Sequence, residues 1–169
     1  MSLSELPVIE PYEIEEDCAY IGQWKNGRRF GRGKGIWKDG SIFEGYWVNG
    51  KASGFGQLIH SDGDIYIGEW KDNMAHGKGR YIHMDGAEYV GDWIADKQHG
   101  VGVETWEDDS RYEGSYFNGV KHDFGKYYHS NGSVYEGNFK ENKIDGKGTY
   151  KWVNGRKYTG EWKNNKMHG

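Results

Sequence analysis

Aromatic and glycine residues recur along the chain at a fixed interval of 23 residues. A Tyr or Phe opens each unit, a Gly follows two residues later, and a Trp, Tyr or Phe follows after two more. The opening rings are Tyr20, Phe43, Tyr66, Tyr89, Tyr112, Tyr135 and Tyr158. Six full units and half of a seventh follow one another without an insertion, so the chain is a repeat protein.

The pattern inside one unit predicts two strands. In "YIGEWK", residues 66–71, rings and glycine alternate with Ile, Glu and Lys, and this period of two predicts a strand. The same alternation predicts a second strand over residues 79–84. The intervening "DNMAHG", residues 72–77, is predicted to be a loop, and "MDGAE", residues 84–88, turns the chain into the next unit. The sequence therefore predicts an antiparallel meander of hairpins.

Glycine inside a strand needs a reason, because it costs roughly 0.5–1 kcal/mol relative to Ala. A side chain between Tyr66 and Trp70 would occupy the space that their rings need. We expect the rings of each unit to cover the glycines of the next unit, as in aromatic rescue. The predicted fold class is all-β, an elongated single-layer antiparallel meander of 23-residue hairpin repeats that forms a twisted ribbon.

The pattern Tyr-x-Gly-x-Trp-x-x-(Gly/Asn)-x-x-His-Gly-x-Gly resembles the MORN repeat (membrane occupation and recognition nexus) over residues 20–169. The resemblance implies a non-enzymatic scaffold for protein–protein interaction, similar to radial spoke head proteins and cytoskeletal MORN scaffolds, in a cytoskeletal or ciliary (axonemal) assembly. The alternative that it implies is a module contacting acidic membrane phospholipids, or a regulatory module of a larger enzyme such as a phosphoinositide kinase. Fold does not decide between these roles.

Residues 1–19 form an acidic leader that precedes the array of residues 20–169. Projected back by one period, residues 8–15 align with the second half of a unit and are predicted to pair with residues 20–25. Pro11 suits an edge strand that must not recruit another chain. We expect the leader to cap the array, and the opposite edge strand to be available for self-association.

Composition narrows the class of protein. Hydrophobic residues make up 35% of the chain, aromatic residues 16%, and 28 of the 169 residues are Gly, which suits one buried aromatic face. No apolar run of 18 residues and no signal peptide are present, and Cys18 is the single cysteine. These features predict a cytoplasmic protein, and the resemblance adds the cytoskeleton or cilium.

Two candidate binding surfaces follow from the repeat. The first is an aromatic groove for a peptide or helix of a protein partner, lined by Trp24, Trp47, Trp70, Trp93, Tyr116, Phe139 and Trp162. The second is a possible partner-specific patch. It consists of residues that depart from the repeat pattern and of acidic residues near them, namely Glu104, Glu107, Asp108, Asp109 and Asp123. For the rings the alternative is a purely structural core, and for the patch it is drift of a tolerant repeat.

Other chemistry is not supported. The histidines fall into a loop set and a strand set, namely His76, His99, His122 and His168, and His60, His83 and His129. Equivalent residues in adjacent units lie roughly 9–10 Å apart, too far to share zinc. The glycines fit no phosphate-binding loop, and no catalytic set stands out. We expect no metal, no cofactor, no catalysis and no nucleic acid. With a net charge of −4 and no continuous basic face, membrane binding is a secondary role.

Overall fold

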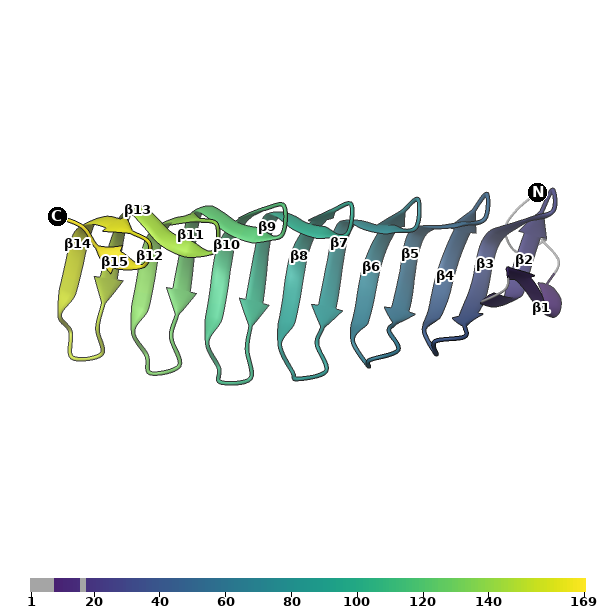
Figure 1. Cartoon of the computed structure of the whole chain (residues 1–169), viewed down its shortest axis with the longest axis horizontal. Coiled ribbons are helices and arrows are strands. Elements are labelled where there is room, and N and C mark those ends of the chain that lie inside the picture. The colour runs from purple at the N-terminus through teal and green to yellow at the C-terminus, as the bar shows by residue number, and fades with distance from the viewer. Residues whose placement is uncertain (1–7, 16–17) are drawn as a thin grey trace. The chain divides into compact units, whose positions relative to one another are not determined.

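The chain folds into strands joined by tight turns, and its predicted all-β antiparallel meander is confirmed (Figure 1). In this computed structural model, the structure describes the backbone of residues 8–15 and all of residues 18–169. Two compact units divide the chain between residues 84 and 85. None of the described residues belongs to a helix long and apolar enough to cross a membrane.

Within each unit, every strand pairs antiparallel with the next strand along the chain. The strands of the first unit are β1 (Val8–Glu15), β2 (Cys18–Lys25), β3 (Arg28–Trp37), β4 (Ile42–Val48), β5 (Lys51–Ile59), β6 (Ile65–Lys71) and β7 (Met74–Ile82). Those of the second are β8 (Glu88–Ile94), β9 (Lys97–Thr105), β10 (Arg111–Phe117), β11 (Val120–Tyr128), β12 (Val134–Lys140), β13 (Lys143–Lys151), β14 (Lys157–Lys163) and β15 (Lys166–Met167).

The hairpin loop inside each repeat is shorter than predicted. Asp72 and Asn73 alone connect β6 to β7, with φ values of 49° and 68°. Positive φ at both residues gives a type I′ turn, whose twist matches that of the flanking strands. The expected loop over residues 72–77 is therefore wrong, because β7 already begins at Met74, and β7 ends at Ile82 instead of residue 84.

The observed strand bounds also change the element to which each histidine belongs. The set predicted to lie in loops lies mostly in strands, namely His76 in β7, His99 in β9 and His122 in β11. The set predicted to lie in strands begins the turns instead, namely His60, His83 and His129, each directly after a strand. The reason is the same in both cases, since each second strand starts and ends earlier in the repeat than the alternation suggested.

Glycines stand opposite one another across the strands of each unit. In the first unit Gly56 of β5 is paired with Gly45 of β4 and with Gly68 of β6, and Gly68 is also paired with Gly79 of β7. The opening ring of the repeat lies over such a pair, because a methyl group at Gly79 would overlap the hydroxyl and ring of Tyr66. The ring thus covers glycines of its own repeat, and the prediction that it covers those of the next repeat is wrong. The hairpin register causes this, since it sets Gly68 opposite Gly79 within one repeat.

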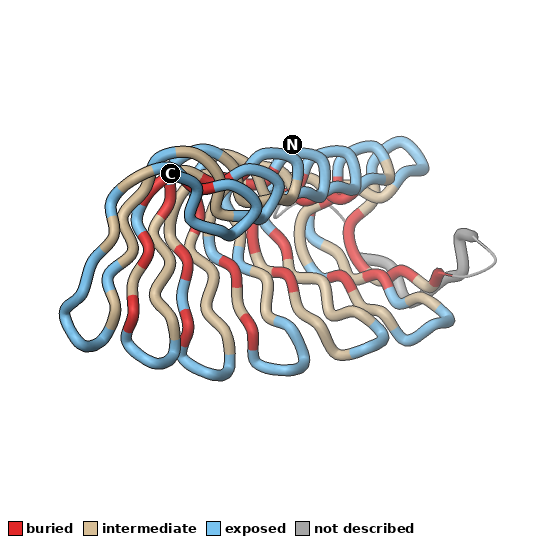
Figure 2. The backbone as a smooth tube through the Cα atoms, turned by 60° about the vertical axis from the view of Figure 1, so that its left-hand side comes forward, coloured by how far each residue is buried: buried red, intermediate tan, exposed pale blue. Residues whose placement is uncertain are grey.

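The large rings carry the contacts between repeats. Trp70 packs edge to face on Tyr66 of its own repeat and on Phe43 of the preceding one, both at 5.0 Å between ring centroids. Its indole N–H donates to the carbonyl oxygen of Gly56, 3.1 Å away. Edge-to-face pairs of this kind contribute beyond the area they bury. Figure 2 shows the buried residues along the strands and the exposed ones at the turns.

The leader contributes β1, which pairs antiparallel with β2 and places Val8 opposite Gln23 and Tyr12 opposite Tyr20. The irregular register of this pairing includes two shifts, one between Ile9 and Tyr12 and one between Glu13 and Glu15. The division of the chain into a capping leader and an array stays a prediction, and residues 1–7 and 16–17 of the leader lie outside the described residues.

Candidate binding site on the aromatic face

The rings predicted to line a groove are packed into the aromatic face, which we define as the side of the sheet that bears the opening rings. Each of them contacts the opening ring of its own repeat edge to face. Trp24 is half-buried, and the others are buried, namely Trp47, Trp70, Trp93, Tyr116, Phe139 and Trp162. Their contribution to the core is thus observed, and their role as a groove for a partner stays a prediction.

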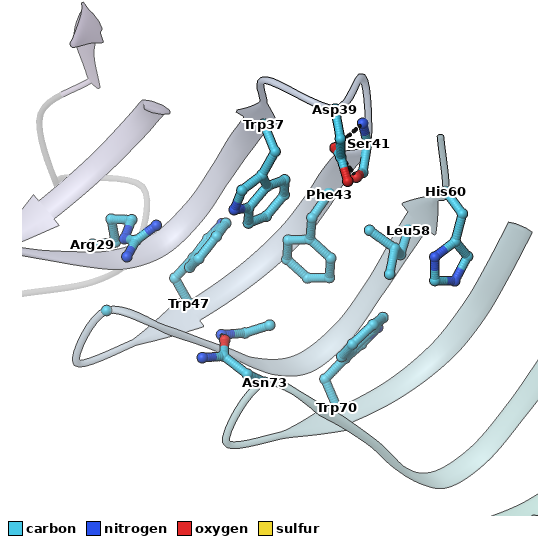
Figure 3. A pocket seen from close by; sticks show the side chains of 12 residues that line it. Arg29, Trp37, Asp39, Ser41, Phe43, Trp47, Leu58, His60, Trp70 and Asn73 are labelled. Carbon is cyan, nitrogen blue, oxygen red and sulfur yellow. Dashed lines mark hydrogen bonds between the residues drawn. The ribbon is translucent and has the colours of Figure 1, made fainter. Parts of the chain in front are cut away.

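A pocket of about 390 Å³ opens on this face in the first unit (Figure 3). Phe43, Trp47 and Trp70 lie around it, and Trp37 lies beside them. The remaining lining comes from β3 to β6 and their turns, namely Arg29, Asp39, Ser41, Gly50, Ala52, Leu58, His60 and Asn73. The site is concave and combines aromatic and aliphatic side chains with polar and charged groups.

Two charged side chains stand at this pocket. The Arg29 guanidinium lies 4.9 Å from the centroid of the Trp47 ring, a cation–π contact. Asp39 accepts hydrogen bonds from the hydroxyl and the backbone N–H of Ser41, and these hold the pKa of the Asp39 carboxyl below its usual range. The exposed rim of the pocket therefore carries an ionised carboxylate at neutral pH.

Glu104 is part-buried, with a side chain that is 18% exposed, and its partner-specific role stays a prediction. Its carboxylate accepts a hydrogen bond from the Tyr116 hydroxyl at 2.7 Å and lies 3.9 Å from the Lys121 ammonium. In other repeats a Trp donates to a glycine carbonyl, as Trp47 does to Gly33 at 3.0 Å. Tyr116 and Glu104 therefore depart from the repeat together, because the tyrosine hydroxyl takes the glutamate as its acceptor.

Lys121 is the residue that sequence reasoning missed. Its side chain is 14% exposed, and its ammonium lies 5.0 Å from the Trp106 ring centroid and 5.3 Å from that of Tyr112. Burial lowers the pKa of Lys121, and the neighbouring Glu104 carboxylate opposes this effect. The signal available in the sequence was a lysine at a position where two other repeats have alanine.

The other acidic candidates lie in two places. Glu107, Asp108 and Asp109 are exposed in the turn between β9 and β10, whereas Asp123 is exposed within β11. Asp109 and Asp123 replace repeat glycines and keep the positive φ of those positions, at 67° and 62°. Aspartate tolerates this conformation better than most residues. A partner-specific role for these residues stays a prediction.

The described residues contain no group of three or more His, Cys, Asp and Glu side chains placed to hold a metal ion. "GRGKG", residues 31–35, lies within β3 and opens no helix. Cys18 is buried, with its sulfur 3.9 Å from the Arg29 Nη1.

Comparison with known families identifies the repeat. The MORN repeat matches residues 20–42, 43–65, 66–88, 89–111, 112–134, 135–155 and 158–169. The chain belongs to the MORN repeat family. Comparison with curated proteins gives no match.

Solved structures give distant likenesses to this MORN repeat chain. The Drosophila melanogaster SAS-4 (dCPAP) TCP domain, in complex with a proline-rich motif of Ana2, has a TM-score of 0.46 at 11% identity over 78% of each chain. The TCP10 domain of Danio rerio CPAP has a TM-score of 0.31 at 14% identity over 93% of this chain and 94% of that chain.

Proposed function

We propose that this MORN repeat protein is a non-enzymatic scaffold that binds a peptide or helix of a protein partner on its aromatic face. The observation that carries the proposal is the pocket between Phe43, Trp47 and Trp70, which opens in a row of otherwise closely packed rings. Aromatic side chains that line a concave site are common anchors of protein interfaces. By family resemblance, we propose a cytoplasmic setting in the cytoskeleton, the cilium or its axoneme.

Neighbouring residues on opposite faces allow a direct test. Leu58 lines the pocket on the aromatic face, whereas Gln57 lies on the other face of the same strand, where it lines a second hollow. A photo-crosslinking amino acid is placed at either position, and adducts formed in cytoskeletal and ciliary fractions are identified by mass spectrometry. The proposal requires a protein adduct that depends on position 58, and the same adduct must form with that partner in purified form. Adducts from position 57 alone would contradict it.

Acidic phospholipid binding is the second candidate, because the opposite face of the first unit combines cations with apolar groups. Arg32 and Lys34 line the hollow on that face together with Phe55, whose side chain is 58% exposed. Flotation with anionic and neutral vesicles at low and high salt, for the native chain and for a variant with R32E and K34E, tests this role. Binding to anionic vesicles that the variant loses would favour it.

A further inference from the structure

One strand position in each repeat faces the large ring of the preceding strand. In the strand ladder, the residue at this position is always paired with the residue that carries that ring. Ala52 is paired with Trp47, and Lys121 is paired with Tyr116. The residues at this position are Arg29, Ala52, Ala75, Gln98, Lys121, Ile144 and Met167. Five of them are long, and the two alanines are short. The pocket of the first unit lies beside one of these alanines, Ala52.

The second unit shows the same place with a side chain in it. Trp106, Tyr112 and Lys121 stand at the repeat positions of Trp37, Phe43 and Ala52. There the Lys121 side chain is 14% exposed, and its ammonium lies over the Trp106 and Tyr112 rings. The pocket beside Ala52 therefore corresponds to the space that the Lys121 side chain occupies in its own repeat.

We infer that the pocket beside Ala52 takes the side chain of a lysine presented by a protein partner. This inference rests on the proposed function and names the anchor of the bound segment. We expect the alkyl stem to lie beside Phe43 and Trp47. Their equivalents are Tyr112, near the Lys121 ammonium, and Tyr116, the strand partner of Lys121. The ammonium then faces Trp37, the equivalent of Trp106.

The electrostatics of the pocket fix the direction of the bound lysine. Glu104 neutralises Lys121, but its repeat position in the first unit is Gly35, which offers no carboxylate. Asp39 lines the same pocket on the side of Trp37 and is ionised, so it supplies the negative charge (Figure 3). Arg29 lies beyond Trp47 and repels a cation from that end. The ammonium therefore lies at the end formed by Trp37 and Asp39.

A minimal probe is n-butylammonium, which reproduces the lysine side chain, with n-butanol and butyrate as uncharged and anionic comparators. The indole N–H signals of Trp37, Trp47 and Trp106 are followed by nuclear magnetic resonance during titration. The inference requires a saturable shift of the Trp37 and Trp47 signals that is larger for n-butylammonium than for either comparator. An equal response to butanol, or a stronger one to butyrate, would overturn it in favour of an apolar or acidic anchor.

Exchanging the two residues provides matched variants. A52K and A52I are designed to fill the pocket from within with the side chains that stand at the equivalent positions 121 and 144, and both must abolish the response of Trp37 and Trp47. K121A must make Trp106 respond to n-butylammonium. Q57K, on the opposite face, leaves the response unchanged. Circular dichroism verifies that each variant is folded, and if K121A does not fold, the two substitutions at Ala52 still decide the question. A response that survives both of them would overturn the inference.

The crosslinking test at Leu58 is independent of this titration. If n-butylammonium fails while a partner still crosslinks at position 58, the lysine anchor is wrong and the scaffold remains. If no partner crosslinks at position 58, the proposed function is wrong, regardless of the result of the n-butylammonium titration.

Discussion

At the scale of single residues, the hydroxyl of an opening tyrosine holds the bulge of its own strand. The Tyr66 hydroxyl donates to the carbonyl oxygen of Glu69 at 2.9 Å, where the register with β7 shifts between Gly68 and Trp70. Tyr20, Tyr89, Tyr112, Tyr135 and Tyr158 make the same bond three residues ahead. Phe43 has no hydroxyl, so its repeat lacks this bond.

Exchanging the two ring types measures that bond. Y66F removes the donor and keeps the ring, so we expect the free energy of unfolding to fall by about 0.5–1.5 kcal/mol. F43Y adds a donor near the Tyr46 carbonyl and is expected to raise it by no more than that. Denaturant unfolding of both variants and the native chain gives the values. Equal stability of all three proteins would mean that the hydroxyl does not hold the bulge.

Residue identity alone predicted part of the site. The recurrence of Trp70 and its equivalents indicated rings on one face, and the pocket does lie among such rings. The role of Glu104 was not predictable, because its contact with Tyr116 depends on a hydroxyl that reaches from β10 to the neighbouring strand β9. The pocket beside Ala52 was not predictable either, since a short side chain leaves a pocket only if the residues around it do not fill the space.

At the scale of elements, an asparagine in the hairpin turn ties one repeat to the preceding one. The Asn73 backbone N–H donates to the Ala52 carbonyl oxygen at 3.1 Å, and its side-chain oxygen accepts from the Ala52 N–H at 2.7 Å. Asn142 and Asn165 make the same pair of bonds to Lys121 and Ile144. Where the position is Gly50, the backbone bond to Arg29 remains at 2.9 Å.

Replacing this asparagine separates its two bonds. N73G keeps the positive φ and the backbone bond but leaves the Ala52 N–H without its side-chain acceptor, so we expect a loss of about 1 kcal/mol in unfolding free energy. N73A should cost more, because alanine is strained at a φ of 68°. Thermal and denaturant unfolding compare both variants. A stability of N73A equal to that of N73G would contradict the role of the backbone conformation.

The first strand of each repeat was predictable and the second only in part. Residues 66–71 alternate cleanly, and β6 covers them. The start of β7 was missed, because Asn73 and Gly77 both have the character of loop residues. Asn73 belongs to the turn, whereas Gly77 has a φ of 101° inside the strand. Glycine in a strand can mark a local irregularity as well as its end, and composition does not distinguish the two.

At the scale of the whole molecule, buried tyrosines make stability sensitive to alkaline pH. Burial raises the pKa of Tyr20 and Tyr135 to about 12, and it also raises the pKa of Tyr89, Tyr112 and Tyr116 above the usual value. An unfolded chain loses these protons near pH ~10. The stabilisation is therefore complete below about pH 10 and is lost as the pH rises towards 12.

Lys121 has the opposite effect on the unfolding free energy as the pH rises. Its pKa in the folded state is lowered, so its burial costs less once it has lost its proton. The pKa of Tyr81 is raised as well, by burial and by its hydrogen bond to Asp64. One lysine therefore opposes six tyrosines, so we expect a net fall in unfolding free energy between about pH 9 and pH 11.5. Denaturant unfolding at several pH values, with tyrosinate absorbance as a second signal, measures it. A free energy that stays constant or rises across this range would show that the rings are not protected from ionisation.

The leader offers a second test at this scale. Because β1 pairs with β2, deletion of residues 2–17 leaves that edge of β2 without its partner. Unpaired strand edges recruit other chains. We expect the shortened protein to associate in size-exclusion chromatography with light scattering and to melt at a lower temperature. A monomer with an unchanged melting temperature would show that the leader is not a cap.

The ring contacts between repeats also set how such a protein can change in length. The Tyr20 ring meets Trp47 of the next repeat at 5.3 Å, and Phe43 meets Trp70 in the same way at 5.0 Å. Removing residues 43–65 as a block would bring Trp70 to the place of Trp47 against Tyr20. Loss of a number of residues that is not a multiple of 23 would break the geometry. Lineages can therefore lengthen or shorten the protein by duplicating or losing whole repeats, while single positions such as that of Ala52 diverge freely within each copy.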